Sequence, residues 1–164
     1  MPRKEHQSSQ SANRVAKRAE GAKRTQQDTS PDVMAIAFET HEGRMVTDAN
    51  ETILKVNNAF TRITGYSVQD VVGKTPAFLG SGLHDAAFFA AMREQLEQSG
   101  GWQGEIWNRR KSGEVYPQWL AITAVKSAAG RTTHYLGTLT DISERKSVEN
   151  ELRKALGELS SPGK

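Results

Sequence analysis

Large apolar side chains are scarce along residues 1–30 and recur at regular intervals from Pro31 onwards. The first stretch is rich in Gln, Ser, Ala, Lys and Arg, a composition that buries too little apolar surface to fold alone. Near Asp141 the pattern changes again, from strand-like alternation to helical spacing. The sequence therefore predicts a disordered basic tail at 1–31, one folded domain at 32–141 and a C-terminal helix with the chain end at 142–164.

Five short segments have the β-prone residues and the apolar–polar alternation of strands. Turn-prone residues join the first two segments into one hairpin and the next two into another. These segments are 44–48, 52–56, 102–110, 114–126 and 132–140. Helical patterns cover 33–41, after Pro31, and most of the region between the second and third strands. We predict an α+β fold, with a five-stranded antiparallel sheet, a helical block on one face, and flanking N-terminal and C-terminal helices.

The helical block is predicted to consist of three pieces. Asn57 or Asn58 is suited to cap a first helix that stops at Gly65, and Ser67 is suited to cap a second that stops at Gly73. The third and longest piece covers residues 84–98, which lack internal Gly and Pro.

Both faces of the last three strands carry apolar side chains, which is unusual for a sheet with one face in water. One face is predicted to hold Ile106, Tyr116, Leu120, Ile122, Tyr135 and Leu139, and the other Trp107, Trp119, Val125 and Leu136. A sheet face with two tryptophans needs a cover. We therefore expect a homodimer through the outer sheet face and the terminal helices.

The C-terminal segment has the pattern of an amphipathic helix. Asp141-Ile-Ser-Glu144 resembles a helix cap with a glutamate three residues on. Apolar positions then follow at Val148, Leu152, Ala155 and Leu159. We expect Asp141 to cap this helix and to join it to the last strand.

Composition excludes several classes of function. The chain has no cysteine, which rules out disulfides, thiolate metal sites and cysteine nucleophiles. It has no apolar run long enough to cross a membrane and no secretory signal pattern, so a cytoplasmic location is expected. The basic tail lacks aromatic residues for base stacking, which argues against nucleic-acid binding.

Four stretches resemble the PAS domain family, over about residues 32–145. They are TDANETILKVNNAFTRITGYS, VVGKTPAFLGSGLHDAAFF, WQGEIWNRRKSGEVYPQW and HYLGTLTDISERK, in the family's order. They look most like PAS domains found upstream of bacterial diguanylate cyclases, cyclic-di-GMP phosphodiesterases and sensor kinases. The resemblance implies a PAS fold with a pocket between the sheet and the helices, in a module of intracellular signal transduction.

The resemblance also singles out three candidate cofactor-binding residues. Asn108 and Gln118 match the two amides with which flavin-binding relatives hold the polar edge of the ring, and an amide offers both a donor and an acceptor. Trp102 is similar to a tryptophan of flavin-dinucleotide redox sensors in the family. FAD is therefore a candidate cofactor. The alternative is that the amides bond to backbone or water and that Trp102 only packs.

Other positions depart from the light-sensing pattern. Pro76, Ala77 and Leu139 stand where light-oxygen-voltage relatives carry a reactive cysteine, a phosphate-binding arginine and a glutamine, so adduct photochemistry is excluded. His84 lies near the position of a haem ligand in other relatives, but no second histidine pairs with it by spacing.

No residues form a catalytic or a metal site by pattern. The basic run Arg109-Arg110-Lys111 is interpreted as the solvated end of a hairpin.

The sequence thus predicts a non-enzymatic sensor that detects a small ligand or a redox state and relays it through the C-terminal helix to a downstream signalling protein. Two alternatives stay open. One is a cofactor-free adaptor or dimerisation module, and the other is a regulatory fragment of a cyclic-di-GMP enzyme or a sensor kinase.

Overall fold

The computed structural model describes residues 31–159. The predicted disorder of the basic tail concerns residues that, except for Pro31, lie outside this range. Helix α2, Pro31–Phe38, belongs to a first unit that ends at Phe38, and all other described elements belong to a second unit that starts at Glu39.

Helix α2 forms where the apolar pattern predicts a helix, but it ends three residues before the predicted end at residue 41. The following residues are polar, and the Thr40 hydroxyl donates to the Glu42 carbonyl, a local bond that competes with helix formation. Val33, Met34 and Ile36 are exposed on this helix. The expected role of this helix in a homodimer stays a prediction.

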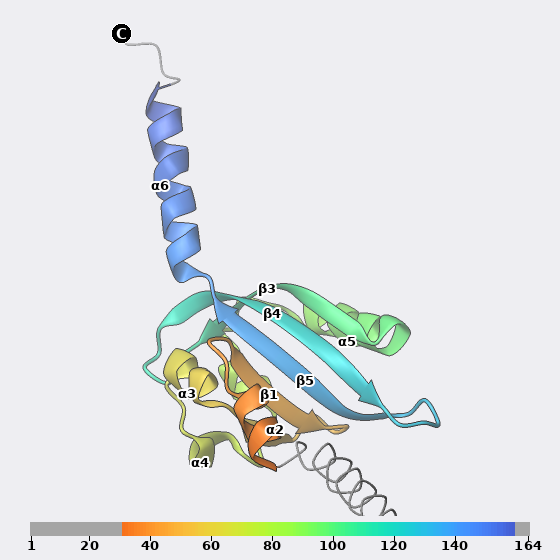
Figure 1. The fold of residues 1–164 in the computed structure, drawn as a ribbon. Helices are drawn as coiled ribbons and strands as arrows, with labels where there is room; N and C mark the ends of the chain where they lie inside the picture. The colour runs from red at the N-terminus through yellow and green to blue at the C-terminus, as the bar shows by residue number, and fades with distance from the viewer. Residues whose placement is uncertain (1–30, 160–164) are drawn as a thin grey trace, which may run out of the picture. The chain divides into compact units, whose positions relative to one another are not determined.

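The second unit is built on one five-stranded antiparallel sheet, as predicted (Figure 1). The strands are β1 Gly43–Asp48, β2 Ile53–Val56, β3 Gly101–Arg109, β4 Val115–Lys126 and β5 Thr132–Asp141. Their order across the sheet is β2-β1-β5-β4-β3, so the first and last strands pair at its centre and β3 is an edge.

The turn between β1 and β2 is held by an aspartate. The Asp48 carboxylate accepts hydrogen bonds from the N–H groups of Asn50 and Thr52. The left-handed residue of the turn is Glu51, at φ 64°, and not the asparagine that sequence preference favours.

The helical block contains α3 Asn58–Thr64, α4 Val68–Val71, the 3-10 helix η1 Pro76–Leu79 and α5 Ala86–Ser99. The predicted caps are confirmed for the first two helices: the Asn57 side chain accepts from the Phe60 N–H, and Ser67 and Asp70 form a reciprocal capping box. Helix α5 begins two residues later than predicted because Asp85 is its cap. The 3-10 turn, with Pro76 in its first turn, has no counterpart in the predicted elements.

The core lies on the face of the sheet that the helical block covers. Ile106, Tyr116, Leu120 and Leu139 are buried there, as the alternation predicts. On the other face Trp119 is 39% exposed and Val125 is 46% exposed. The two-faced pattern of the last three strands is therefore confirmed, and apolar side chains remain on the outer face.

Helix α6, Ser143–Leu159, follows the end of β5 (Figure 1). Asp141 is still part of β5, so the helix starts one residue later than a cap at Asp141 would place it. Ile142 lies between them; it is 4% exposed, and its N–H donates to the Pro117 carbonyl. Val148, Leu152 and Leu156 on α6 are more than half exposed. No helix among the described residues has the length and apolar character needed to cross a membrane.

Candidate functional site

A cavity of about 670 Å³ opens between the sheet and the helical block. Its floor is the inner face of β1, β3, β4 and β5, and its walls come from η1, residues 80–84 and α5. Apolar side chains dominate the lining, among them Met45, Leu79, Met92, Ile106 and Leu120. Size and character are those of a site for a small organic ligand.

Two amide side chains, Asn108 and Gln118, line this cavity. Asn108 is on β3, and Gln118 is on the neighbouring strand β4, directly opposite Ile106. Asn108 lies two residues after Ile106 on the same strand, so Asn108 and Gln118 both point to the inner face. Asn108 is 6% exposed and Gln118 is 1% exposed. The Gln118 Oε1 accepts from the Tyr116 hydroxyl at 2.8 Å, whereas the Asn108 side chain has no hydrogen bond to any residue within 31–159.

Buried amides are almost always paired, so this pair of side chains has donor and acceptor capacity that a bound ligand can use. The structure thus brings together two of the three residues singled out from the sequence.

Trp102, the third, does not line the cavity. Its indole lies over Gly104, where a Cβ atom would come within 2.9 Å of the ring. The ring also meets Phe88 of α5 in an edge-on contact, with centroids 6.0 Å apart. Trp102 therefore packs between β3 and α5, beside the core and not against the amides.

The positions that depart from the light-sensing pattern do reach the cavity: Pro76, Ala77 and Leu139 all line it. His84 also lines it, but its Nε2 accepts a hydrogen bond from the Trp107 N–H at 2.8 Å. Its ring stacks on Phe88 with centroids 4.2 Å apart. Within the described part of the chain no three acidic or histidine side chains gather as a metal site.

A charged pair at the cavity was not predicted. Arg93 of α5 and Glu51 of the β1–β2 turn both line it, and their side chains lie 3.4 Å apart with 61% and 47% exposure. Arg93 is the one arginine or lysine among the lining residues of the described range. Helical spacing does not predict this role. Arg93 lies one position after the buried Met92, so the pattern predicts a solvent-facing residue.

The interpretation of Arg109-Arg110-Lys111 as a solvated hairpin end holds for Arg109 and Lys111, which are exposed, but is wrong for Arg110. Arg109 donates to the carbonyls of Gly113 and Ser81, and Lys111 lies 2.7 Å from Asp70. The hydrogen bonds from Lys111 and Ser67 lower the pKa of Asp70 to about 2. The Arg110 side chain is 17% exposed, so it belongs to the interior of the junction between the hairpin, α3 and β5.

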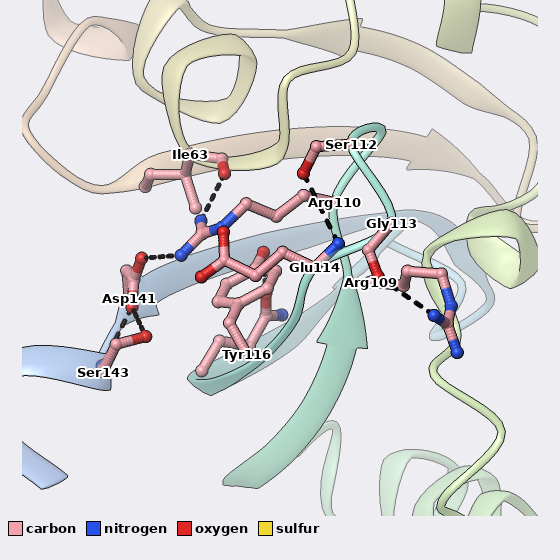
Figure 2. Close-up of polar contacts among 10 residues, drawn as sticks. Ile63, Arg109, Arg110, Ser112, Gly113, Glu114, Tyr116, Asp141 and Ser143 are labelled. Carbon is pink, nitrogen blue, oxygen red and sulfur yellow. Dashed lines mark hydrogen bonds and ion pairs between the residues drawn. The ribbon is translucent and has the colours of Figure 1, made fainter. Parts of the chain in front are cut away.

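Arg110 is the centre of a polar network (Figure 2). Its guanidinium donates to the Ile63 carbonyl at the end of α3, to Glu114 and to Asp141. It also lies over the Tyr116 ring, 3.7 Å from the ring centroid, in a cation–π contact. One side chain thus touches the helical block, β4 and the end of β5.

Asp141 connects this network to α6. Its Oδ2 accepts from Arg110, while its Oδ1 accepts from the Ser143 N–H at 2.9 Å and from the Ser143 hydroxyl at 2.6 Å. Burial alone would raise the pKa of Asp141, but the hydrogen bonds from Ser143 and Arg110 outweigh it and hold the pKa below its usual value. The expectation that Asp141 joins the last strand to the helix is confirmed.

The network also reaches the cavity. Burial raises the pKa of Tyr116 to about 12, so at neutral pH its hydroxyl is protonated and donates to Gln118. Contacts therefore run without a gap from Gln118 through Tyr116, Arg110 and Asp141 to Ser143. A second link, Lys146 to Glu105 at 2.9 Å, holds the first turn of α6 to β3.

Comparisons with known proteins agree with this architecture. The nitrogen fixation regulatory protein of Klebsiella oxytoca is 34% identical over 108 residues, 66% of this chain and 22% of that protein. A blue-light-activated histidine kinase of Rhizobium johnstonii is 30% identical over 122 residues, 72% of this chain and 35% of that protein. The chain thus spans about a fifth to a third of the length of these relatives.

Among solved structures, an RNA-binding light-oxygen-voltage receptor is 26% identical with a TM-score of 0.68, over 77% of this chain and 36% of that one. A PAS domain from Colwellia psychrerythraea, at 22% identity and a TM-score of 0.65, covers 69% of this chain and 97% of that one and supports the fold alone. The family model described as a PAS domain matches residues 41–144. With the sheet order, the cavity and this match in agreement, the chain belongs to the PAS domain family.

Proposed function

We propose that this PAS domain is a sensor whose cavity holds a flavin and whose output is the state of helix α6. The observation that carries the proposal is the pair of buried amides, Asn108 and Gln118, that face a cavity of about 670 Å³. The apolar lining suits a flat ring system, and the amides suit a ring edge with alternating donors and acceptors. Relatives named as blue-light-activated kinases support the choice of a flavin.

The fit is good for binding and poor for adduct photochemistry. Asn108 and Gln118 would hold the polar ring edge, and Arg93 at the cavity would pair with an anionic phosphate in place of the arginine that Ala77 replaces. FAD is the dinucleotide that the sequence resemblance indicates, and Trp102 would act on it only indirectly, by packing β3. A bound flavin supplies reversible redox chemistry. No cysteine is present to form a covalent adduct.

The route of output follows from the contacts. Gln118 accepts a hydrogen bond from the Tyr116 hydroxyl, and the Tyr116 ring makes a cation–π contact with Arg110. Arg110 in turn donates to Asp141, just before α6. A change at the Gln118 amide therefore alters the position that Arg110 can take and the hydrogen bonds available to Ser143. Leu139, one of three β5 residues that line the cavity, has no polar group for this purpose. The contacts that lead from Gln118 to α6 start on β4, so the signal would pass through β4.

A second candidate function is a ligand-free adaptor that holds two copies or two proteins together. It is favoured by the exposed apolar residues Trp119 and Val125 on the outer sheet face and by Val148, Leu152 and Leu156 on α6. A homodimer through these surfaces is compatible with both functions. The downstream partner would be a signalling protein that reads α6.

Absorption spectroscopy of the full chain tests the flavin proposal. Protein purified as expressed, or incubated with FAD or FMN and then desalted, should show a flavin spectrum. Asn108→Ala combined with Gln118→Ala should abolish the spectrum while thermal unfolding stays cooperative. Gln103→Ala removes an exposed amide of the same strand β3 and should leave binding unchanged. Wild-type protein that stays colourless after incubation with either flavin would leave the adaptor as the better account.

A further inference from the structure

The segment of residues 80–84, called the strap below, lies along the free edge of β3. Gly80 forms a single antiparallel bridge with Asn108. The Ser81 hydroxyl donates to the Trp107 carbonyl at 2.7 Å, and the Trp107 N–H donates to His84 Nε2 at 2.8 Å. Both backbone groups of Trp107 are thus satisfied by side chains of the strap and not by a neighbouring strand, which is one way of covering a sheet edge.

The strap is also part of the cavity wall. Gly80, Ser81, Gly82 and His84 all line the cavity. If the strap lifts from β3, the cavity therefore opens at the edge of the sheet, beside Asn108. The rest of the lining comes mainly from the sheet, η1 and α5, and each of these contributes residues to the packed core.

Few contacts oppose such a movement. Leu83 is 67% exposed and contributes little buried surface. Gly82 has φ +83° and nothing within 4 Å of an added Cβ, so it lies in open space. Apart from the Gly80 bridge, three side-chain bonds hold the strap to β3: those of Ser81 and His84 to Trp107, and that of Arg109 to the Ser81 carbonyl. The ring contacts of His84 with Phe88 and Phe89 hold the end of the strap to α5, so release of His84 is the step that would free the strap.

His84 gives this fastening a dependence on pH. Its Nε2 accepts a hydrogen bond, which requires the neutral imidazole with its proton on Nδ1. A protonated imidazole carries N–H groups on both nitrogens. Two donors, Nε2–H and the Trp107 N–H, would then point at each other, and the hydrogen bond would be lost. The ring would have to leave its place on Phe88, where it is stacked.

The charged groups around His84 do not replace the lost bond. Asp85, next in the chain, has its carboxylate engaged by the Phe88 N–H as the cap of α5. Arg109 on β3 is bound to the carbonyls of Ser81 and Gly113. The faces of α5 in ring contact with His84 are Phe88 and Phe89, which are uncharged.

We propose that the strap is the gate of the cavity and that His84 is its latch, closed when the imidazole is neutral and released when it is protonated. Protonation of Nε2 removes the acceptor of the bond from the Trp107 N–H, so the gate would open as the pH falls. The proposal goes beyond the flavin assignment, because it concerns access to the cavity by any small ligand. It rests on the proposed function only in assuming that the cavity takes one.

Hydrogen exchange of the ligand-free full chain tests the latch directly, after correction for intrinsic exchange rates. In the wild type, protection of the Trp107 amide and of residues 81–84 should fall about tenfold between pH 7.5 and 5.5, the equivalent of one lost hydrogen bond. His84→Gln keeps an acceptor that does not titrate and should stay protected at both pH values. His84→Ala should be unprotected at both.

Equal protection of the wild type at the two pH values would overturn the latch, and so would a parallel loss of protection in His84→Gln. A second measurement follows the release of FMN from loaded protein into excess apo-flavodoxin. Release should be faster at pH 5.5 than at 7.5 in the wild type and unaffected by pH in His84→Gln; release that is faster at low pH in both would overturn the gate. Failure to load either FMN or FAD would contradict the proposed function, while the exchange experiment still decides the latch.

Discussion

Arg110 lies with its guanidinium carbon 3.7 Å from the centroid of the Tyr116 ring and donates, from the same side chain, to Asp141. Tyr116 is bonded to a residue of the cavity, and Asp141 is bonded to the first residue of α6. The guanidinium is therefore the one group in this network that contacts both sides of the junction. Lysine cannot do the same, because it lacks the planar fork that stacks and binds two acceptors together.

Replacing Arg110 should loosen α6 without removing the fold. Arg110→Lys should cost about 1–2 kcal/mol and Arg110→Met about 2–3 kcal/mol in urea unfolding, since the second leaves Asp141 without its charged donor. In both variants hydrogen exchange should rise at the start of α6. Arg109→Met, the neighbouring exposed arginine, is the control and should leave exchange in α6 unchanged. Unaltered exchange in Arg110→Met would mean that the network does not hold α6.

Asp141→Ala tests the same junction from the other side. The variant loses three accepted hydrogen bonds, so it should cost about 1–2 kcal/mol and raise hydrogen exchange over residues 142–156. Glu144→Ala, which removes an exposed carboxylate from the first turn of the same helix, should have a much smaller effect.

The stabilising effect of Asp141 should also depend on pH. Because its pKa is lowered in the folded protein, its contribution is present above the unfolded pKa, about 3.9, and is lost as the pH falls through the folded value. The stability difference between wild type and Asp141→Ala should therefore shrink below about pH 4. A difference that is constant from pH 7 to pH 3 would contradict the ionised, hydrogen-bonded carboxylate.

Tyr116→Phe should abolish an alkaline loss of stability. The pKa of Tyr116 is raised to about 12 in the folded protein, so the unfolded chain loses this proton first, near pH 10. Wild-type stability should then fall by about 1.4 kcal/mol per pH unit above pH 10, relative to the variant. Tyr66→Phe serves as the control tyrosine. Parallel curves for wild type and Tyr116→Phe up to pH 11 would show that the phenol is not shielded.

Trp119→Asp tests the outer sheet face. Trp119 is 39% exposed on that face, and a carboxylate placed there should shift a dimer toward monomer in sedimentation velocity. Val72→Asp changes an exposed apolar residue of similar exposure, 44%, next to α4, and should leave the sedimentation coefficient unchanged. A wild type that is monomeric at all concentrations would remove the dimer from the proposed function.

Local signals account for the parts of the fold that the sequence predicts well. The cap at Asn57 depends on a bond to a residue three positions away, and the end of α3 depends on the left-handed Gly65, at φ 77°. Strand alternation likewise assigns Ile106 and Trp119 to opposite faces, because the period of a strand is fixed. Each of these features is decided within a few residues.

The Arg110 network could not be predicted in this way. Its partners Ile63 and Asp141 lie 47 and 31 residues away, and only the packed sheet brings them to one place. The run of three cations looks solvated because solvated runs are the common case. For Trp102, the resemblance indicates a role at the cofactor but does not tell which way the indole turns. The missing Cβ atom of Gly104 leaves the room that the ring fills.

Ile142 fixes the rotational phase of whatever follows the domain. The residue is buried and bonded to Pro117, and the helix starts immediately after it. Each residue added to or removed from α6 would turn a downstream segment by about 100°, and seven residues would bring it back close to its first orientation. In chimeras that attach another domain beyond α6, output should therefore vary periodically with the length of the linking helix.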